Sequence, residues 1–293
     1  MREGRPSTTA SLVAAIRAFY TALPAPYRLA PDPLAASIVP PFFALPARVA
    51  SLSPTLAPAL HRGLGLLSFG LSYHVPLRTR RIDDALRTAV DLGARQLVIL
   101  GAGLDTRALR LDELASVAVF EVDYPATQRF KEERLARLAP PPRVRAGHLA
   151  RVSIDFETQR LEDVLPAAGF RREERSFWIW EGVTVYLSAE AIEATLQAVS
   201  QLSAPGSRLA VTYGPVDVRA LPFWAMPLAK SLVRMMGEPL KEPLLPEALL
   251  AMFERASLTR IEDTATRDWG ARYWPELGGV RSIERLAVAE KRA

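Results

Sequence analysis

A glycine turn after a short apolar run is the feature of this sequence that most directly predicts a ligand site. The run QLVIL, residues 96–100, is followed by Gly101, Ala102 and Gly103. Glycines at the end of a strand let the backbone come close to a nucleotide-like ligand, because glycine has no side chain and tolerates a left-handed conformation. The third glycine of the dinucleotide pattern G-x-G-x-x-G is absent, since Thr106 stands in its place. The turn therefore predicts a nucleotide-like cofactor and leaves its identity open.

Two carboxylates near the turn help to choose between cofactors. Asp123 lies twenty residues after Gly103, at the end of VAVFEVD, where it can accept hydrogen bonds from the ribose hydroxyls of NAD or of S-adenosylmethionine. Asp105 stands where a dinucleotide would place its phosphates, on the first amides of a helix. A carboxylate there repels phosphates but is compatible with the sulfonium and ammonium of S-adenosylmethionine, so Asp105 is a candidate cofactor residue. It could equally be an N-cap of the following helix.

The elements that must position these residues alternate between strands and helices. Ile82, Leu86 and Val90 recur every four residues and predict a helix that ends at Gly93. The alternation that follows predicts an α/β fold, with a seven-stranded, mostly parallel sheet covered by helices on both faces. The predicted strands are residues 96–100, 117–123, 147–155, 176–182, 208–214, 258–263 and 284–291, and the predicted helices between them are residues 106–114, 126–138, 161–169, 189–202 and 246–256.

The N-terminal residues 1–75 are rich in proline and alanine. Frequent prolines exclude long helices in the middle of this stretch. We therefore expect a helical cap, made of short helices and loops, that packs on a larger cofactor-binding domain of residues 76–293. Near the start, Leu12, Ile16 and Phe19 have the spacing of one helical face.

The interval 214–245 interrupts the alternation and is predicted to be a lid. An insertion at the carboxyl end of a strand is well placed to cover a ligand crevice. Its apolar side chains would line an adaptable pocket for a small apolar or aromatic molecule. A pair of core-facing helices without a ligand role is the equal alternative. The residues of the predicted roof are Phe223, Trp224, Met226, Met235 and Met236.

Composition excludes several classes of function. The chain has 293 residues, 49% hydrophobic and 24% charged, with a formal net charge of +5 that comes mostly from scattered arginines. No block of basic residues marks a nucleic-acid-binding arm, so we expect no nucleic-acid partner. The absence of cysteine excludes disulfides, thiolate metal ligands and cysteine nucleophiles. His61, His74 and His148 lie far apart, which disfavours a zinc site, and we expect no metal.

The N-terminal segment also bears on location. Arg17 interrupts the apolar stretch that a signal peptide would need. No run reaches the roughly eighteen apolar residues of a membrane-spanning helix. We therefore expect a cytoplasmic protein without a membrane partner, and its oligomeric state stays open.

Several ordered motifs resemble those of the leucine carboxyl methyltransferase family. They are VILGAGLDTRALRL, VFEVDYPATQRFKEERL, SIDF, WEGVTVYLSAEAIEATL and LSAPGSRLAV, and with Arg78 they cover residues 78–213. Within the family, the chain looks most like the bacterial branch of S-adenosylmethionine-dependent O-methyltransferases. The resemblance implies a class I methyltransferase-like fold of the Rossmann type, with S-adenosylmethionine as the cofactor.

The resemblance also implies roles for single residues around the cofactor. Gly101 and Gly103 would line its methionine part, and Asp123 would hold the ribose hydroxyls. Asp155, in SIDF, would accept a hydrogen bond from the adenine amino group, and Phe156 would add a backbone amide and an apolar contact. Asp123 and Asp155 could instead only cap the ends of their strands.

Charged residues and one tyrosine complete the implied site. Arg78 would pair with the cofactor carboxylate, because the arginine fork suits bidentate pairing, although the assignment could slip within RTRR. Arg17 would share that duty. Glu181 would face the cofactor ammonium. Tyr186 would point toward the methyl acceptor as a catalytic residue, with a core aromatic as the alternative.

The chemistry of methyl transfer narrows the acceptor. Displacement at a sulfonium is in-line, and the main task of the enzyme is to align the reacting atoms at about 3–3.5 Å. A carboxylate is already ionised near neutral pH and needs no general base. For a phenol or an alcohol a general base would help, and the candidates are His74, His148, Glu181 and Asp105. Their spacing in the sequence does not indicate a catalytic arrangement of these residues. We therefore expect O-methylation of a carboxylate or hydroxyl on a small apolar or aromatic molecule, with carboxylates and acidic phenols favoured.

Three alternatives stay open. The chain could methylate a protein C-terminal carboxylate by the same chemistry. It could be an NAD-dependent oxidoreductase, which Thr106, Asp105 and the lack of a clear Tyr-x-x-x-Lys pair disfavour. It could also be a binding module that keeps the fold without turnover.

Overall fold

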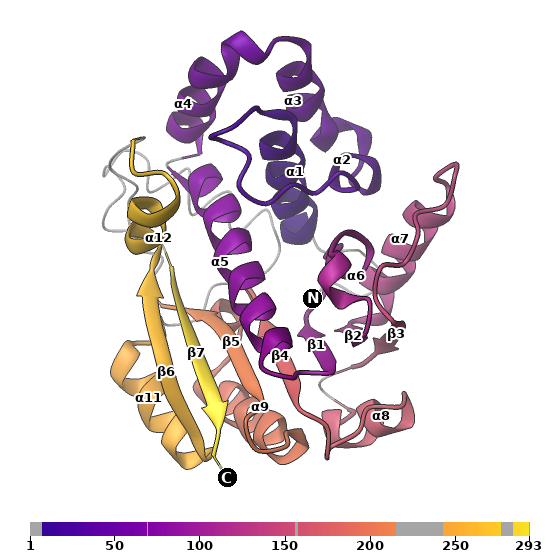
Figure 1. Ribbon diagram of the computed structural model, residues 1–293, viewed down its shortest axis with the longest axis vertical. Coiled ribbons are helices and arrows are strands. Elements are labelled where there is room, and N and C mark those ends of the chain that lie inside the picture. The colour runs from indigo at the N-terminus through magenta and orange to yellow at the C-terminus, as the bar shows by residue number, and fades with distance from the viewer. Residues whose placement is uncertain (1–7, 69, 156–157, 215–242, 277–283, 293) are drawn as a thin grey trace.

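The computed structural model describes residues 8–68, 70–155, 158–214, 243–276 and 284–292. Seven strands form one sheet at its centre, five paired in parallel and the last antiparallel to both neighbours (Figure 1). This confirms the predicted sheet. The spatial order is β3 (His148–Ser153), β2 (Ala118–Asp123), β1 (Gln96–Leu100), β4 (Ser176–Trp180), β5 (Arg208–Tyr213), β7 (Arg285–Lys291) and β6 (Leu258–Ala265).

Helices precede or connect these strands, most of them at the places that the sequence predicts; the helix Thr266–Tyr273, between β6 and β7, was not predicted. The first begins earlier than expected, at Leu71, because Pro76 is accommodated inside it. They are α5 (Leu71–Asp91), α6 (Arg107–Arg110), α7 (Pro125–Ala136), α8 (Leu161–Ala167), α9 (Ala189–Leu202), α11 (Pro246–Arg255) and α12 (Thr266–Tyr273).

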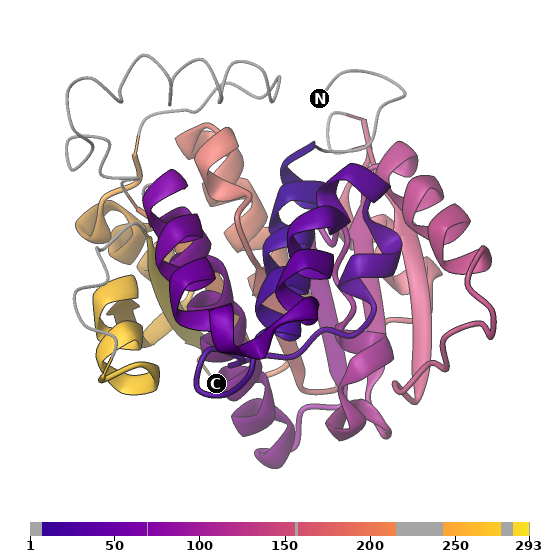
Figure 2. The same ribbon diagram turned by 90° about the horizontal axis from the view of Figure 1, so that it is seen from above.

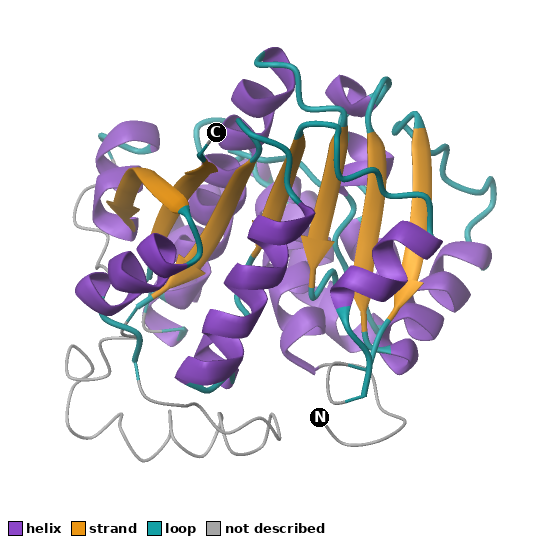
Figure 3. Ribbon diagram, turned by 90° about the horizontal axis from the view of Figure 1, so that it is seen from below, coloured by secondary structure: helices purple, strands orange, loops and turns teal. Residues whose placement is uncertain are grey.

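Helices cover both faces of the sheet (Figure 3). Successive side chains of a strand point to opposite faces. In β1, Leu97 and Ile99 therefore join the core that α5 and α12 share, whereas Val98 and Leu100 join the core formed with α8, α9 and α11. A strand buried on both faces is mostly apolar, which explains the unbroken apolar run of residues 97–100 that follows Gln96 in β1.

The N-terminal part is helical, and its first helix is present where the apolar spacing predicts it. The helices are α1 (Thr8–Ala22), α2 (Ala35–Ile38), α3 (Pro41–Leu52) and α4 (Ala57–Leu67). Ile16 and Phe19 of α1 enter the same core as α5, and the indigo N-terminal helices lie beside violet α5 in Figure 2. Because α5 runs without a break through residues 75 and 76, the division into cap and main domain stays a prediction.

The segment after the glycine turn differs from expectation. A helix is predicted over residues 106–114, but α6 has only four residues, and a 3-10 turn, Asp112–Leu114, follows it. Leu111 separates the two in an extended conformation and is buried. The short helix places Arg107 at its first position, directly beneath the turn.

The strand order locates the ligand crevice. β1 lies between β2 and β4, so the chain leaves it toward β2 and β3 on one side and later continues from β4 on the other. Open α/β sheets bind ligands at the carboxyl ends of the strands where the order reverses. Gly101 follows β1, Asp123 ends β2, Asp155 follows β3 and Glu181 follows β4.

Some predictions fall on residues that the structure does not describe. The roof residues of the predicted lid, from Phe223 to Met236, and the candidate Phe156 lie outside the described residues. In the described ranges, no helix combines the length and apolarity needed to cross a bilayer.

Candidate functional site

The glycine turn brings backbone, rather than side chains, to the crevice. Gly101 and Gly103 have φ angles of +66° and +51°, in the left-handed region that favours glycine. A Cβ on Gly101 would lie 2.6 Å from Cγ2 of Val183. The Gly101 N–H donates to the Val122 carbonyl at 2.9 Å, which ties the turn to β2. Both predicted glycines are therefore required by conformation, and Gly101 also by space.

Asp123 joins the tip of β2 to this turn. Its carboxylate accepts hydrogen bonds from the Gly103 N–H and, at 2.6 Å, from the Tyr124 N–H. Burial raises the pKa of Asp123, against the lowering effect of these two N–H groups. The carboxylate is 7% exposed, at the position where the sequence predicts ribose binding. That role stays a prediction.

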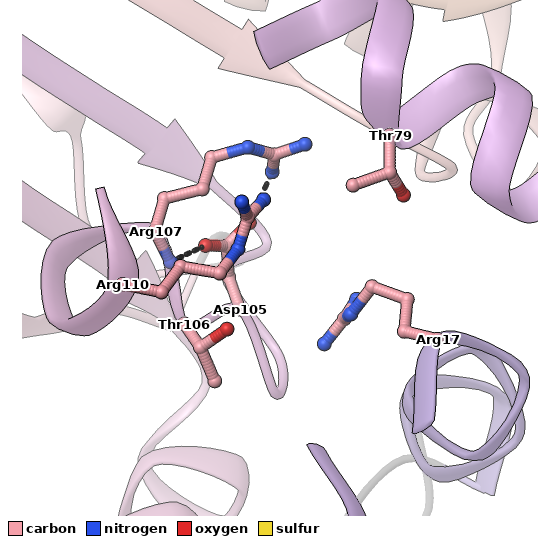
Figure 4. Close-up of a pocket in the computed structure, with 6 residues that line it drawn as sticks. All are labelled: Arg17, Thr79, Asp105, Thr106, Arg107 and Arg110. Carbon is pink, nitrogen blue, oxygen red and sulfur yellow. Dashed lines mark hydrogen bonds and ion pairs between the residues drawn. The ribbon is translucent and has the colours of Figure 1, made fainter. Parts of the chain in front are cut away.

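Asp105 is paired rather than free to face a ligand. Its Oδ1 accepts from the Arg107 N–H at 2.7 Å, and its Oδ2 forms an ion pair with the Arg107 guanidinium (Figure 4). Burial alone would raise the pKa of Asp105, but the charges of Arg107 and then Arg17 outweigh it and lower the pKa to about 2. The N-cap of α6 is Thr106 rather than Asp105, so the capping alternative was wrong in its position: Asp105 accepts the first N–H of the helix from one residue earlier. Arg107 compensates the charge, so repulsion of phosphates by Asp105 is weaker than the sequence suggested.

Arg107 is the residue that sequence reasoning missed. It is 2% exposed, and its Nε lies 2.7 Å from Asp83 Oδ1 on α5 while its Nη1 lies 3.1 Å from Glu181 Oε2 after β4. Arg110 Nη2 lies 2.7 Å from the other oxygen of Asp83. The one signal in the sequence was a pair of arginines in a segment that otherwise buries leucines. Nothing local marks Asp83 as their partner.

A second guanidinium, that of Arg78, holds the other oxygen of Glu181. Arg78 Nε lies 2.8 Å from Glu181 Oε1, and its Nη1 lies 2.9 Å from Glu284 Oε2. Arg80 and Arg81 instead pair with Asp84 and Glu262. Among the arginines of RTRR, Arg78 is therefore the one that reaches the crevice.

The neighbours of Glu284 and Glu181 determine the pKa values of these two carboxyl groups. Burial would raise the pKa of Glu284, but Arg78 and His74 outweigh burial and lower it to about 2. Burial likewise acts to raise the pKa of Glu181, and Arg78 and Arg107 lower it on balance. Both groups are therefore anionic at neutral pH. In this structure the partners of Arg78 are Glu181 and Glu284, and its predicted pairing with a cofactor carboxylate stays a prediction.

Arg17 links the N-terminal helix α1 to the glycine turn. Its Nε lies 2.9 Å from Asp32 Oδ2, and its Nη2 donates to the Leu104 carbonyl at 2.5 Å. Arg17, Thr79, Asp105, Thr106, Arg107 and Arg110 line a small recess (Figure 4). Among the described residues, Thr106 Oγ1 and Arg107 Nη2 are buried without a hydrogen-bond partner. The recess therefore contains two buried polar groups beside the turn that can still donate a hydrogen bond.

The last two described candidates lie at the rim. Asp155 is half-buried after β3, and its N–H donates to Gln159 Oε1 at 3.0 Å. Tyr186 ends the 3-10 turn Thr184–Tyr186 and is also half-buried. Their places after β3 and β4 agree with the predicted arrangement, and their roles stay predictions.

The candidate bases are poorly placed for proton abstraction. His148 is exposed at the first residue of β3, at the opposite end of the sheet from the crevice. His74 is buried, with its Nε2 2.6 Å from Glu284 and its Nδ1 3.2 Å from Thr266. Within the described residues, no group of three or more His, Cys, Asp or Glu could hold a metal ion.

Residues 10–200 match the model of the leucine carboxyl methyltransferase family. The chain therefore belongs to this family, as its motifs predict. Membership in a methyltransferase family supports the predicted S-adenosylmethionine over NAD as the cofactor.

Two relatives each carry the name "Putative S-adenosyl-L-methionine-dependent methyltransferase". The one from Parafrankia sp. (strain EAN1pec) is 43% identical over 158 residues, which cover 54% of this chain and 50% of the relative. The one from Mycobacterium sp. (strain JLS) is 42% identical over 208 residues, which cover 69% of this chain and 65% of the relative. The matched part of the chain thus spans half to just under two thirds of the length of these relatives.

A solved structure has the same fold. It is that of a "putative methyltransferase" from Thermobifida fusca YX, with a TM-score of 0.58 and 16% identity, covering 100% of this chain and 97% of that chain. Together with the strand order, this confirms the predicted class I methyltransferase-like fold.

Proposed function

We propose that this protein is an O-methyltransferase that uses S-adenosylmethionine and acts on an oxygen that is already ionised, on a small apolar or aromatic molecule. One observation carries the proposal. In a chain of this family, the carboxyl ends of β1, β2 and β4 bring together a left-handed glycine turn, the Asp123 carboxylate and Glu181.

The residues present fit the cofactor. The left-handed turn at Gly101 and Gly103 places backbone at the carboxyl end of β1, and the Asp123 carboxylate at the end of β2 can accept hydrogen bonds from a ribose diol. Glu181 is anionic at the carboxyl end of β4, where it contributes negative charge near a bound sulfonium or ammonium, whereas Asp105 is paired with Arg107. Thr106 Oγ1 and Arg107 Nη2 are donors with no partner among the described residues, which suits a carboxylate. When bound, the cofactor supplies an electrophilic methyl group on a good leaving group.

The state of the candidate bases favours an ionised acceptor. Glu181 and Asp105 are both held by guanidinium groups that lower their pKa values, and a carboxylate with a low pKa is a weak base. His148 lies at the far end of the sheet, and His74 is bound to Glu284 and Thr266. A carboxylate or acidic phenol needs no proton removed, so the protein would only have to orient it. Tyr186, at the rim beyond Glu181, is the proposed contact to that acceptor.

The competing functions differ in what they bind or release. A protein C-terminal carboxylate would use the same reaction with a larger acceptor. A binding module would hold the cofactor without turnover. An oxidoreductase would bind NAD, and family membership argues against it.

The test combines calorimetry with product analysis. We expect the protein to bind S-adenosylmethionine and not NAD in titration calorimetry. Incubation with methyl-labelled S-adenosylmethionine and a panel of apolar carboxylic acids, phenols and peptides with free C-termini should label oxygen in the small acids or phenols. With a carboxylate acceptor, the rate should be flat between pH 6 and 9. NAD binding without S-adenosylmethionine binding, or methylation at nitrogen or carbon, would refute the proposal.

A further inference from the structure

The buried ionic groups beneath the glycine turn do not balance in charge. We define the charge cluster as three arginines and four carboxylates joined by direct ion pairs. Five of these pairs have distances of 2.7–3.1 Å, and the Arg107–Asp105 pair joins Asp105 to the others. Each side chain is at most 12% exposed. Its members within the described part of the chain are Arg78, Arg107 and Arg110 with Asp83, Asp105, Glu181 and Glu284.

The ionisation states leave one negative charge in excess. Guanidinium groups stay protonated in proteins. The neighbouring ionic groups do not cancel the excess. Arg17 pairs with Asp32, and Lys131 pairs with Glu121. Asp123, at the edge of the turn, accepts from backbone N–H groups rather than from a cation. The remaining neighbour, His74, lies 2.6 Å from Glu284; it is the same in every variant compared below, so the differences between variants do not depend on it.

The two forms of the proposed cofactor differ by one charge. S-adenosylmethionine carries a sulfonium, an ammonium and a carboxylate, so its net charge is +1. S-adenosylhomocysteine, which remains after the methyl group leaves, has a neutral thioether, so its net charge is zero. A buried negative excess acts on the first more strongly than on the second, because water screens buried charges poorly.

We propose that the charge cluster determines the preference of this protein for S-adenosylmethionine over S-adenosylhomocysteine, with Asp83 as a specificity-determining residue. This inference rests on the proposed function. Asp83 lies on α5, 2% exposed, with one oxygen on Arg107 and the other on Arg110. It therefore acts through the field of the cluster, as a positioning and charge-setting residue. The consequence for turnover is that loss of the sulfonium charge weakens binding and helps the product to leave.

Two single substitutions in the charge cluster should change the ligand preference in opposite directions. Asp83→Asn keeps the shape of the side chain and reduces the excess to zero. Arg110→Gln removes a cation whose only ion pair in the described structure is with Asp83, and it raises the excess to two negative charges. The double variant restores an excess of one. The measured quantity is the ratio of the Kd for S-adenosylhomocysteine to the Kd for S-adenosylmethionine, determined by titration calorimetry at pH 8.5.

We expect Asp83→Asn to lower this ratio roughly tenfold, which is the order of magnitude of the interaction between two unit charges about 10 Å apart at an effective dielectric constant of about 20. Arg110→Gln should raise it by a similar factor, and the double variant should return it close to the wild-type value. Asp84→Asn is the matched control, because Asp84 is the next residue on α5 but pairs with Arg80 and Arg87 outside the cluster. Its ratio should stay within twofold of wild type.

The outcomes separate the inference from the proposed function. A cluster that is only structural would weaken both ligands alike and leave the ratio unchanged, and that result with intact S-adenosylmethionine binding would overturn the inference alone. If the wild-type protein does not bind S-adenosylmethionine, the proposed function and the inference fail together. Thermal unfolding checks that each variant is folded. If Asp83→Asn does not fold, Glu284→Gln tests the same reduction of charge and should lower the ratio in the same direction.

Discussion

Replacing Arg107 by methionine should destabilise the fold strongly at neutral pH and much less in acid. Methionine keeps the length and apolar stem of the side chain but removes a guanidinium that is 2% exposed and touches three carboxylates. In the variant, Asp83 still has its ion pair with Arg110, and Glu181 still has its ion pair with Arg78. Asp105 instead loses the largest of the charges that stabilise its ionised form. The substitution therefore leaves a buried carboxylate without its main counter-ion.

The magnitude follows from the environment of Asp105. Removing one partner of a buried ion pair costs about 3–5 kcal/mol. In the wild-type protein the pKa of Asp105 is lowered to about 2, so its contribution to stability is complete above about pH 4 to 5 and is lost as the pH falls toward 2. In the variant, burial acts with less opposition and raises the pKa of Asp105. The group then destabilises the folded state above the ordinary pKa of aspartate, and protonation relieves this. The loss should shrink to about 1–2 kcal/mol near pH 4.

Urea unfolding followed by tryptophan fluorescence at pH 8, 6 and 4.5 measures this difference. Arg145→Met is the control, because its pair with Asp112 is exposed, with side chains 44% and 78% accessible, and it should change stability by less than about 0.5 kcal/mol at each pH. A loss below about 1 kcal/mol for Arg107→Met at pH 8, or a loss that is the same at all three pH values, would show that the cluster does not depend on Arg107 in the way described.

Three further substitutions test the crevice. Gly101→Ala should lower stability by about 1–3 kcal/mol and weaken S-adenosylmethionine binding, because φ is +66° and the new Cβ would lie 2.6 Å from Val183; a variant with wild-type stability would show that the turn is less tight than it looks. Asp123→Ala should weaken that binding about tenfold, the effect of one charged hydrogen bond, and an unchanged Kd would remove Asp123 from the site. Tyr186→Phe should lower kcat at least about tenfold and leave the Kd for S-adenosylmethionine unchanged, whereas an unaltered kcat would place the tyrosine outside the reaction centre.

Much of the fold could be predicted because its signals are local. Residues 97–100 of β1 are all apolar since both faces of the strand are buried, and the part of α5 after Arg78 shows its core face every four residues. The turn at Gly101 and Gly103 and the strand-end Asp123 are local as well. The strand order then brings these predicted residues to one crevice, because the carboxyl ends of neighbouring parallel strands share an edge. The short α6 was not predictable, since the burial of Leu111 in an extended conformation is a tertiary effect.

The partners of the charged side chains were beyond the reach of the sequence. Arg107 lies 24 residues from Asp83 and 74 from Glu181, and periodicity carries no information on which buried charges meet. Arg78 was expected to be free for a ligand and Asp105 to face one, yet each is held by a partner from another segment or from the next turn. The physical reason is that a buried ion must find a counter-ion wherever the packing places one. Local patterns therefore predicted the backbone of the site, while only the assembled sheet and helices decided its electrostatics.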